Sequence, residues 1–191
     1  MKGPGRIWLD GVRHLPSPNA DERPPGTAVD LLVIHNISLP PGHFGDGQVQ
    51  AFFTNRLDPL AHPYFASIAD LTVSAHLLIE RDGTTTQFVA LDRRAWHAGQ
   101  STFCGRDRCN DFSIGIELEG TDDLPFSDIQ YDRLADLTLR IRTLFPSIGD
   151  DSIVGHSDVA PGRKTDPGPH FDWDRLHTML AAGGSRATPR G

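Results

Sequence analysis

Cysteine is scarce in this sequence. Its 191 residues include only Cys104 and Cys109, too few for the disulfide framework that holds many small secreted domains together. Their spacing falls within the range of structural zinc sites, but no second cysteine or histidine pair follows at the spacing of a zinc finger. We therefore expect both cysteines to be free thiols, which fits a reducing compartment.

Long apolar runs are missing too. No stretch is long enough to span a bilayer, and the amino-terminal residues lack the apolar segment that an export signal requires. The sequence therefore predicts a cytoplasmic protein that is not inserted in a membrane.

Positively charged residues are fewer than negatively charged ones. The chain has 18 Lys and Arg residues and 25 Asp and Glu residues, which gives a formal net charge of -7. No clustered basic face is visible, so nucleic acid and anionic membrane surfaces are not expected as partners. With 38% hydrophobic and 23% charged residues, the chain has the composition of a soluble, folded protein rather than a disordered one.

The chain also lacks internal repeats and any linker that would separate two domains, and its length suits a single domain. Residues 1–29 are rich in Pro, Gly and charge and predict an extended arm that packs on the domain, anchored by the apolar segment 7–9. Residues 30–182 form the predicted domain, which we expect to be a monomer. Residues 183–191 are predicted to be a disordered tail.

Both strands and helices are indicated, which favours a mixed α/β class. An apolar run at 31–34 predicts a buried strand of a central sheet. The runs 73–80 and 85–91 are separated by a turn containing Asp82-Gly83, a strong hairpin signal. Residues 113–120 alternate in polarity as a strand does.

Helices are indicated by apolar spacing and by end signals. Apolar residues at helical spacing predict a short helix over 48–57. Ser127 and Gln130 have the arrangement of a capping box, and the helix that they begin is expected to end before Pro146 and to cover one face of the sheet. Its predicted buried stripe comprises Leu134, Leu137, Ile141 and Leu144. A last helix is expected to begin at 171–173.

The most informative stretch is 155–169, where three prolines stiffen a loop that carries His156, Lys164 and Asp166. Imidazole nitrogen and carboxylate oxygen are good zinc ligands, and a catalytic zinc site takes three protein ligands and leaves a fourth position open. His156 and Asp166 can supply two of them. His35, at the end of the first predicted strand, is the best candidate for the third. Histidines and Asp-Pro-Gly turns are also common structural features, and no H-E-x-x-H signature is present, so spacing alone leaves a structural interpretation open.

Other candidate residues also carry alternatives. Glu117 and Glu119 share one strand face, which is either a solvated edge or the position of a general base beside the metal. His76 lies on a predicted strand, where we expect a packed, hydrogen-bonded side chain rather than a chemical role. Trp96 beside His97 in a loop can stack on a sugar ring or a peptide, or can belong to the core.

Four separate pieces of the sequence carry a resemblance to a known family: 33–36 (VIHN), 95–99 (AWHAG), 109–120 (CNDFSIGIELEG) and 164–168 (KTDPG). Through them the chain, from roughly Trp8 to Trp173, resembles the amidase-2 and peptidoglycan-recognition superfamily. Agreement in four separate places is hard to obtain by chance. The resemblance implies a central mixed β-sheet flanked by helices.

The resemblance also implies a chemistry. It assigns a zinc ion to His35, His156 and Asp166, with Glu117 as the catalytic carboxylate and Lys164 as a cationic partner. The reaction is hydrolysis of the amide between 1,6-anhydro-N-acetylmuramic acid and L-alanine in cytoplasmic anhydro-muropeptides, which releases a stem peptide during cell-wall recycling. Ser157 and Gly162 depart from the family pattern, which carries a cysteine and an acidic residue there, and put the rigidity of the loop in question.

The substrate contacts are a further expectation. Candidates for holding sugar and peptide are Asn36, Trp96, His97, Arg108 and Asn110. Two other functions stay open: a module that binds cell-wall fragments without cutting them, and a phage-type amidase that acts on polymeric wall. The presence of all three ligands together with Glu117 favours an enzyme.

Overall fold

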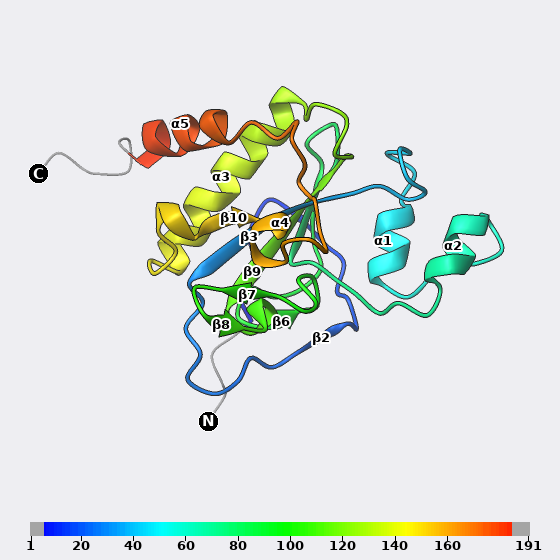
Figure 1. The fold of residues 1–191 in the computed structure, drawn as a ribbon, viewed down its shortest axis with the longest axis horizontal. Coiled ribbons are helices and arrows are strands. Elements are labelled where there is room, and N and C mark those ends of the chain that lie inside the picture. Colours follow the sequence, from blue (N-terminus) through cyan, green and yellow to red (C-terminus); the bar gives the residue numbers. More distant parts are fainter. Residues whose placement is uncertain (1–5, 185–191) are drawn as a thin grey trace, which may run out of the picture.

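The computed structural model describes residues 6–184. A six-stranded sheet with the strand order β1-β5-β4-β9-β3-β10 forms its centre, with helices on both sides (Figure 1). The strands of this sheet are β1 (Arg13–His14), β3 (Leu31–Ile37), β4 (Leu77–Ile79), β5 (Thr85–Gln87), β9 (Ser113–Glu119) and β10 (Ile153–Gly155). Two small sheets pair β2 (Ala20–Asp21) with β6 (Arg94–Ala95) and β7 (Thr102–Phe103) with β8 (Arg106–Asp107).

The central sheet is mixed, which confirms the expected class. Strand β3 pairs in parallel with β9 and β10, and β9 pairs in parallel with β4. Strands β4 and β5 are antiparallel, as the predicted hairpin requires. Its turn contains Gly83 with a φ of +84°, a conformation that glycine adopts without steric cost.

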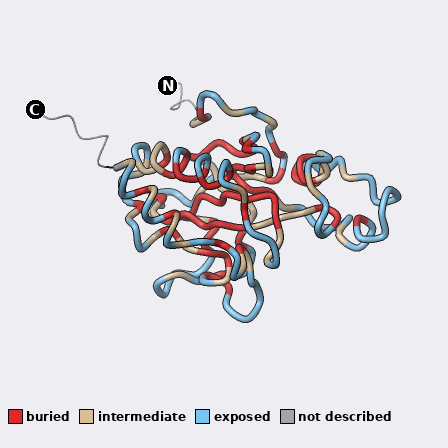
Figure 2. The backbone as a smooth tube through the Cα atoms, turned by 90° about the horizontal axis from the view of Figure 1, so that it is seen from above, coloured by how far each residue is buried: buried red, intermediate tan, exposed pale blue. Residues whose placement is uncertain are grey.

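The two faces of the sheet are covered differently because alternate side chains of a strand point to opposite sides. Helices α3 (Asp128–Leu144) and α5 (Trp173–Gly184) pack against one face. That core contains Leu32, Ile34, Ile114, Ile116, Leu118, Leu134, Leu137, Ile141, Leu176 and Leu180. On the other face, Leu31 and Val33 pack with Ala98, Cys109 and Val159. The central strands are therefore buried on both sides (Figure 2).

Helix α3 begins as predicted. The Ser127 side chain accepts from the backbone of Gln130, and the Gln130 side chain reaches back to the backbone of Ser127. Leu134, Leu137 and Ile141 are buried, but Leu144 is 47% exposed. The predicted stripe is therefore one turn too long, because Leu144 lies in the last turn, where the helix ends.

The segment between β3 and β4 differs from the prediction. Helix α1 (Gln48–Phe53) is shorter than expected, because the chain turns away at Asn55 with a φ of +56°. A second short helix, α2 (Pro63–Ile68), was not predicted; Pro63 occupies its first turn and the His62 side chain caps it. Both helices stand beside the main body (Figure 2).

In the carboxyl-terminal part, the observed element boundaries differ slightly from the predicted ones. The four-residue helix α4 (His156–Val159) occupies the start of the predicted loop, and α5 begins at Trp173. Phe171 precedes α5 as a buried core residue. Helix α5 reaches Gly184, two residues into the predicted tail, and 185–191 lie outside the described residues. Among helices of the described part, none is long and apolar enough for a membrane span.

Residues 6–29 run along the domain surface. Leu9 is buried in the main core, with Ile7 packed against it, and β1 adds to the edge of the sheet beside β5. Arg23 reaches inward and donates to the backbone oxygens of Leu91 and Ser113. The first five residues of the predicted arm lie outside the described part.

Candidate functional site

Three residues that are far apart in the sequence meet at one point. His35 lies on β3, His156 begins α4 directly after β10, and Asp166 lies on the loop that follows. Because β10 and β3 are parallel neighbours with Gly155 opposite Ile34, the two histidines emerge side by side. The Nδ1 atoms of His35 and His156 are 2.9 Å apart, and Asp166 Oδ2 lies 3.1 Å and 3.0 Å from them.

This donor set fits a metal ion. The Nδ1 atoms and Asp166 Oδ2 converge within 4.8 Å of one another. Ligand atoms about 2.0 to 2.2 Å from a tetrahedral ion lie roughly 3.3 Å apart, close to the observed spacing. His156 Nε2 lies 3.1 Å from the carbonyl oxygen of Ala98, and donation to this oxygen leaves its Nδ1 lone pair directed at the point of convergence. Imidazole and carboxylate together suit zinc and other first-row transition metals.

The loop that carries Asp166 is fixed by close packing. The backbone N–H of Ser157 donates to the Asp166 carbonyl at 2.9 Å. A Cβ on Gly155 would lie only 2.8 Å from Pro167 Cδ, so the strand end and the loop require glycine at this contact. Gly162 is exposed with a φ of +76°, a turn conformation that favours glycine. Of the two departures from the family pattern, Ser157 therefore ties the start of the loop to Asp166, and Gly162 occupies an exposed turn.

The electrostatics of the group favour an ionised aspartate. Burial alone would raise the pKa of Asp166, but hydrogen bonds from His156 and His35 outweigh it and lower the pKa well below its usual range. Burial lowers the pKa of His35 to about 4. Neutral imidazole and ionised carboxylate are the protonation states that bind metal.

Glu117 lies beside this group as an incompletely paired carboxyl. It is 8% exposed, and its Oε2 atom has no hydrogen-bond partner within residues 6–184. Burial raises the pKa of Glu117 well above its usual value, the negative charge of Asp166 raises it further, and Lys164 opposes the shift. Strand β9 lies between β4 and β3, so the interpretation of its polar face as a solvated edge is wrong.

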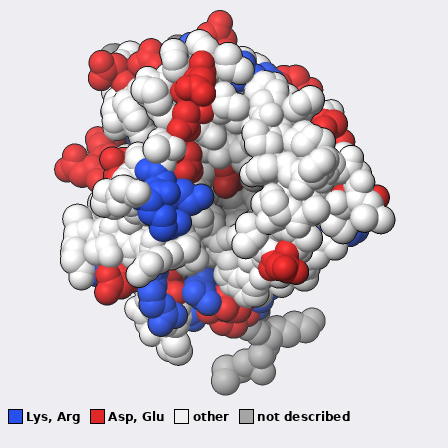
Figure 3. All heavy atoms as spheres, turned by 45° about the vertical axis from the view of Figure 1, so that its right-hand side comes forward, with Lys and Arg blue, Asp and Glu red and all other residues white. Residues whose placement is uncertain are grey.

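A cleft of about 680 Å³ opens over these residues. The three clustered residues, Glu117 and the exposed Lys164 line its polar side. Side chains from α1, α2 and the following turn form an apolar wall of the same cleft: Phe52, Phe53, Tyr64, Ile68 and Leu71. Figure 3 shows a hollow on this side of the molecule with basic and acidic side chains close to it.

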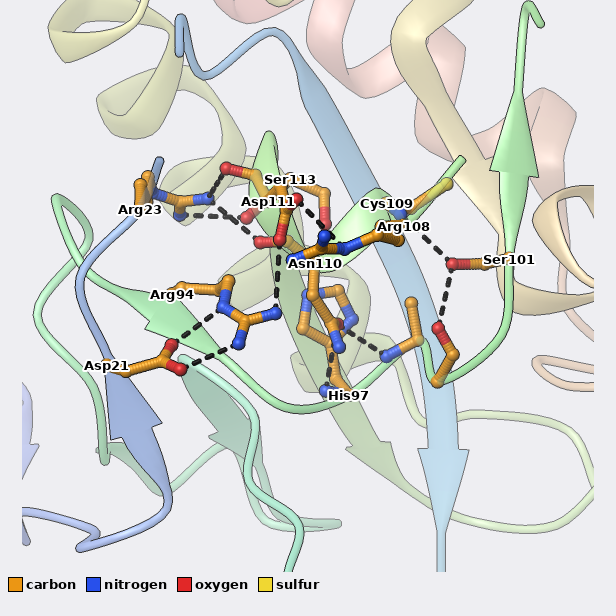
Figure 4. Close-up of polar contacts among 12 residues, drawn as sticks. Asp21, Arg23, Arg94, His97, Ser101, Arg108, Cys109, Asn110, Asp111 and Ser113 are labelled. Carbon is orange, nitrogen blue, oxygen red and sulfur yellow. Dashed lines mark hydrogen bonds and ion pairs between the residues drawn. The ribbon is translucent and has the colours of Figure 1, made fainter. Parts of the chain in front are cut away.

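The predicted substrate-binding residues divide into two groups. Asn36, Trp96 and His97 line the cleft, whereas Arg108 and Asn110 do not. The Arg108 side chain is 69% exposed and pairs with Asp111 at 3.3 Å. The Asn110 side chain accepts from the backbone N–H groups of His97 and Ala98 at 3.1 Å and 2.8 Å (Figure 4).

These two positions lie outside the cleft, and their role as substrate contacts stays a prediction. Residues 109–111 form a 3-10 turn, which packs behind the segment carrying His97. Asn110 is thereby turned into the protein, and Arg108 is directed to solvent.

Two of the predicted residues that line the cleft have polar contacts with other residues of the protein. The Asn36 Nδ2 group donates to Asp122 at 2.7 Å and to the Pro167 carbonyl at 3.1 Å, so its donor side holds two loops together. His97 Nδ1 lies 2.9 Å from His35 Nε2. The His97 ring thus contacts His35 on the side opposite its Nδ1 atom, while it also lines the cleft.

Part of the cleft is formed by residues that were not predicted from the sequence. Asp122 and Asp123 line it, and their position just after β9 is a signal that could have found them, because functional groups collect at strand ends. Arg163 also lines it, and donates to the carbonyls of Ala98 and Gln100 at 2.7 Å and 2.6 Å. The apolar wall gave no comparable signal.

Two expectations outside the cleft are confirmed. His76 is fully buried and hydrogen-bonded, accepting from Gly115 N–H at 3.0 Å and lying 3.0 Å from the Arg93 carbonyl. Cys104 and Cys109 are both free, the first exposed and the second buried.

Two imidazoles and two carboxylates, carried by two strands, a short helix and a loop and open to one cleft, are the features of a candidate active site. A family model of N-acetylmuramoyl-L-alanine amidases, Amidase_2, matches residues 25–169. The chain belongs to this amidase-2 family and is therefore an amide hydrolase.

Individual relatives agree with the family match. The chain is 58% identical over 173 residues to the 1,6-anhydro-N-acetylmuramyl-L-alanine amidase AmpD of Enterobacter cloacae, covering 91% of this chain and 92% of the relative. A crystal structure of selenomethionine AmpD matches with a TM-score of 0.88 and 56% identity, over 91% of this chain and 96% of that chain.

A more distant relative has been solved with a ligand. It is the E. coli amidase AmiD in complex with the substrate anhydro-N-acetylmuramic acid-L-Ala-D-gamma-Glu-L-Lys. It matches with a TM-score of 0.58 and 30% identity, over 83% of this chain and 60% of that chain.

Proposed function

We propose that the chain uses one zinc ion, held by His35, His156 and Asp166, to hydrolyse the amide between 1,6-anhydro-N-acetylmuramic acid and L-alanine. The convergence of the three side chains beside Glu117 carries the proposal. The similarity to AmpD over nine-tenths of both chains supports the choice of substrate. The cytoplasmic location, the role in wall recycling, the monomeric state and the domain limits stay predictions from the sequence.

The roles of the metal ion and of Glu117 in this proposal follow from their positions. When bound, the ion supplies Lewis acidity, which makes water a better nucleophile at neutral pH and the carbonyl a better electrophile. Glu117 takes a proton from the attacking water and later delivers one to the departing nitrogen. Burial raises the pKa of Glu117 toward neutral pH, where the carboxyl can both accept and donate a proton.

Lys164 has an electrostatic role in this proposal. Its positive charge acts on Glu117 and on His35, since it lowers the pKa of both groups. Lys164 also lines the cleft together with these two residues, which supports a role in stabilising the negative charge that develops on the carbonyl oxygen. One well-placed donor of this kind contributes about 3 to 4 kcal/mol to lowering the barrier.

The cleft suits a soluble muropeptide. Its volume of about 680 Å³ is within the range of sites for small molecules. Trp96 and the apolar wall from α1 and α2 offer surfaces for a sugar ring, and the polar side faces the amide. The incompletely paired Glu117 carboxyl favours catalysis over the alternative of a binding module, because burying such a group without using it is costly.

The test combines metal content with substrate choice. We expect one zinc per chain, and release of stem peptide from soluble anhydro-muropeptide at a much higher rate than from intact wall. Chelation should abolish cleavage, and added zinc should restore it. His35→Ala and Asp166→Ala should lose both metal and activity.

Each alternative has its own outcome in the same test. Full activity without metal contradicts the proposed chemistry. Preference for intact wall supports the phage-type amidase, and binding of the muropeptide without cleavage supports the recognition module.

A further inference from the structure

Both histidines of the proposed metal site are supported from behind by one short segment, His97–Ala98. The carbonyl oxygen of Ala98 lies 3.1 Å from His156 Nε2, and His97 Nδ1 lies 2.9 Å from His35 Nε2. We propose that His97 is a positioning residue that accepts the Nε2 proton of His35, so that the Nδ1 lone pair of His35 is free to bind the metal. This inference rests on the proposed metal site.

The placement of protons follows from the chemistry of neutral imidazole, which has one N–H donor and one acceptor nitrogen. The His35 atom that faces His156 and Asp166 is Nδ1. If Nδ1 binds metal, the proton of His35 must be on Nε2, and His97 Nδ1 must accept it. His97 then carries its own proton on Nε2, which lies 3.1 Å from Ser113 Oγ.

The opposite arrangement is incompatible with metal binding. A proton on His97 Nδ1 would be donated to His35 Nε2, and the proton of His35 would then occupy Nδ1, at the centre of the ligand group. The chain from His35 through His97 to Ser113 therefore has two neutral arrangements. Only the one in which His97 accepts leaves His35 able to bind metal.

The surroundings of His97 fix its ring in this position. A Cβ on Gly115 would lie 2.5 Å from the Cγ atom of His97, so the ring occupies space that only glycine leaves open. The Asn110 amide oxygen holds the backbone of His97 and Ala98 (Figure 4). Asn110, predicted as a substrate contact, thereby acts on the metal site through this segment.

A purely structural role for His97 makes a different prediction. If its ring only fills the space above Gly115, an aromatic ring of similar size should replace it without effect on metal binding. If it acts as an acceptor, a smaller residue with an acceptor at the position of Nδ1 should replace it better. His97→Phe keeps the ring and removes the acceptor, whereas His97→Asn places a side-chain oxygen near the position of Nδ1.

Zinc affinity of the full chain, measured by competition with a chromogenic chelator, distinguishes the two roles. We expect His97→Phe to weaken zinc binding by about 10- to 100-fold, and His97→Asn to stay much closer to the parent. The control is His177→Phe, which replaces an exposed histidine on α5, across the sheet from the site, and should bind zinc as the parent does.

Imidazole proton–nitrogen spectra of the zinc-loaded parent give a second readout that needs no variant. We expect His35 and His97 both protonated at Nε2. A proton on His97 Nδ1, parental zinc affinity in His97→Phe, or equal weakening in His97→Asn and His97→Phe overturns the inference. Failure of the parent to bind zinc would instead overturn the proposed metal site, so the two failures are distinguishable.

Discussion

His35 on β3 and Glu117 on β9 are direct partners in a parallel ladder of the central sheet. Both side chains therefore project from the same face, and their separation is set by backbone hydrogen bonding and not by a flexible loop. A proposed metal ligand and a proposed proton carrier are thus held on neighbouring strands of the central sheet. Sites built on strands keep their geometry better than sites built on loops.

Glu117→Gln should retain zinc and lose hydrolysis. The amide keeps the shape of the side chain but cannot accept a proton from water, and general acid–base groups typically contribute about 100- to 10,000-fold in rate. The matched control is Glu119→Gln, two residues further along the same face. Glu119 instead accepts backbone N–H groups of Gly45 and Arg81 at 2.7 Å and 3.2 Å. Cleavage by Glu117→Gln at the parental rate contradicts the assignment.

Lys164→Ala should reduce kcat by about 100-fold or more, the equivalent of about 3 kcal/mol of lost charge stabilisation. The Michaelis constant should change much less, because the charge that Lys164 opposes develops only in the transition state. Lys164→Arg keeps the positive charge and should recover part of the rate. Steady-state kinetics on the anhydro-muropeptide give both constants. An effect on KM alone would mean that Lys164 serves binding.

Ionisation of Glu117 should make the stability of the metal-free protein fall as the pH rises. The folded protein holds the Glu117 proton more tightly than the unfolded chain, because burial raises its pKa well above the usual 4.5. As pH rises above 4.5, the unfolded state ionises first, so this group destabilises the fold progressively until its folded pKa is passed. Glu117→Gln should therefore be more stable than the parent at neutral pH, and this difference should shrink on acidification.

Urea unfolding in the presence of a chelator, at several pH values between about 4 and 7, measures this difference. A difference between variant and parent that does not change with pH would show that Glu117 keeps an ordinary pKa in the fold.

Acid should destabilise the fold through His76. Burial first, and the nearby Arg23 charge second, lower the pKa of His76 from 6.5 to about 3. Below pH 6.5 the unfolded chain takes up a proton that the folded protein excludes, so stability falls by up to about 1.4 kcal/mol per pH unit until the folded pKa is reached. His76→Asn keeps an acceptor for the Gly115 N–H, and its unfolding free energy should depend less steeply on pH.

The control for this acid effect is His177→Asn, because His177 is exposed. It should follow the pH dependence of the parent. If the unfolding free energy of His76→Asn depends on pH as steeply as that of the parent, protonation of His76 does not destabilise the folded protein.

Arg23→Met should destabilise the protein by about 3 kcal/mol, because carbonyl oxygens that now receive charged donors would be left buried without partners. The Arg23 guanidinium donates to the carbonyls of Leu91, Asn110, Asp111 and Ser113, and burial lowers its pKa to about 10. Arg56→Met, at an exposed position, is the matched control. Denaturant unfolding of both variants measures the loss of unfolding free energy. A loss for Arg23→Met that is no larger than the loss for Arg56→Met would mean that the Arg23 hydrogen bonds do not stabilise the fold.

Much of the local structure could be predicted because it depends on residues near each other in the sequence. The Asp82-Gly83 turn specifies its hairpin, and the exchange between Ser127 and Gln130 starts α3 where expected. Alternation over 113–120 identified which side chains of β9 enter the core. His35, His156 and Asp166 were recognised because ligand residue types stood at the end of a predicted strand or in a stiffened loop, although β3 continues beyond His35 to Ile37.

Other features depend on contacts between distant segments, and only the tertiary structure decided them. The sequence by itself determined which residues have the chemistry of a metal site, since that is a property of each side chain and its neighbours. It did not determine that His97 stands behind His35, that Asn110 holds the His97 backbone, or that Arg108 faces solvent. Those relations depend on contacts between distant segments, as does the parallel register of β3 and β10 that brings His35 and His156 together, and short-range patterns carry no information about such contacts.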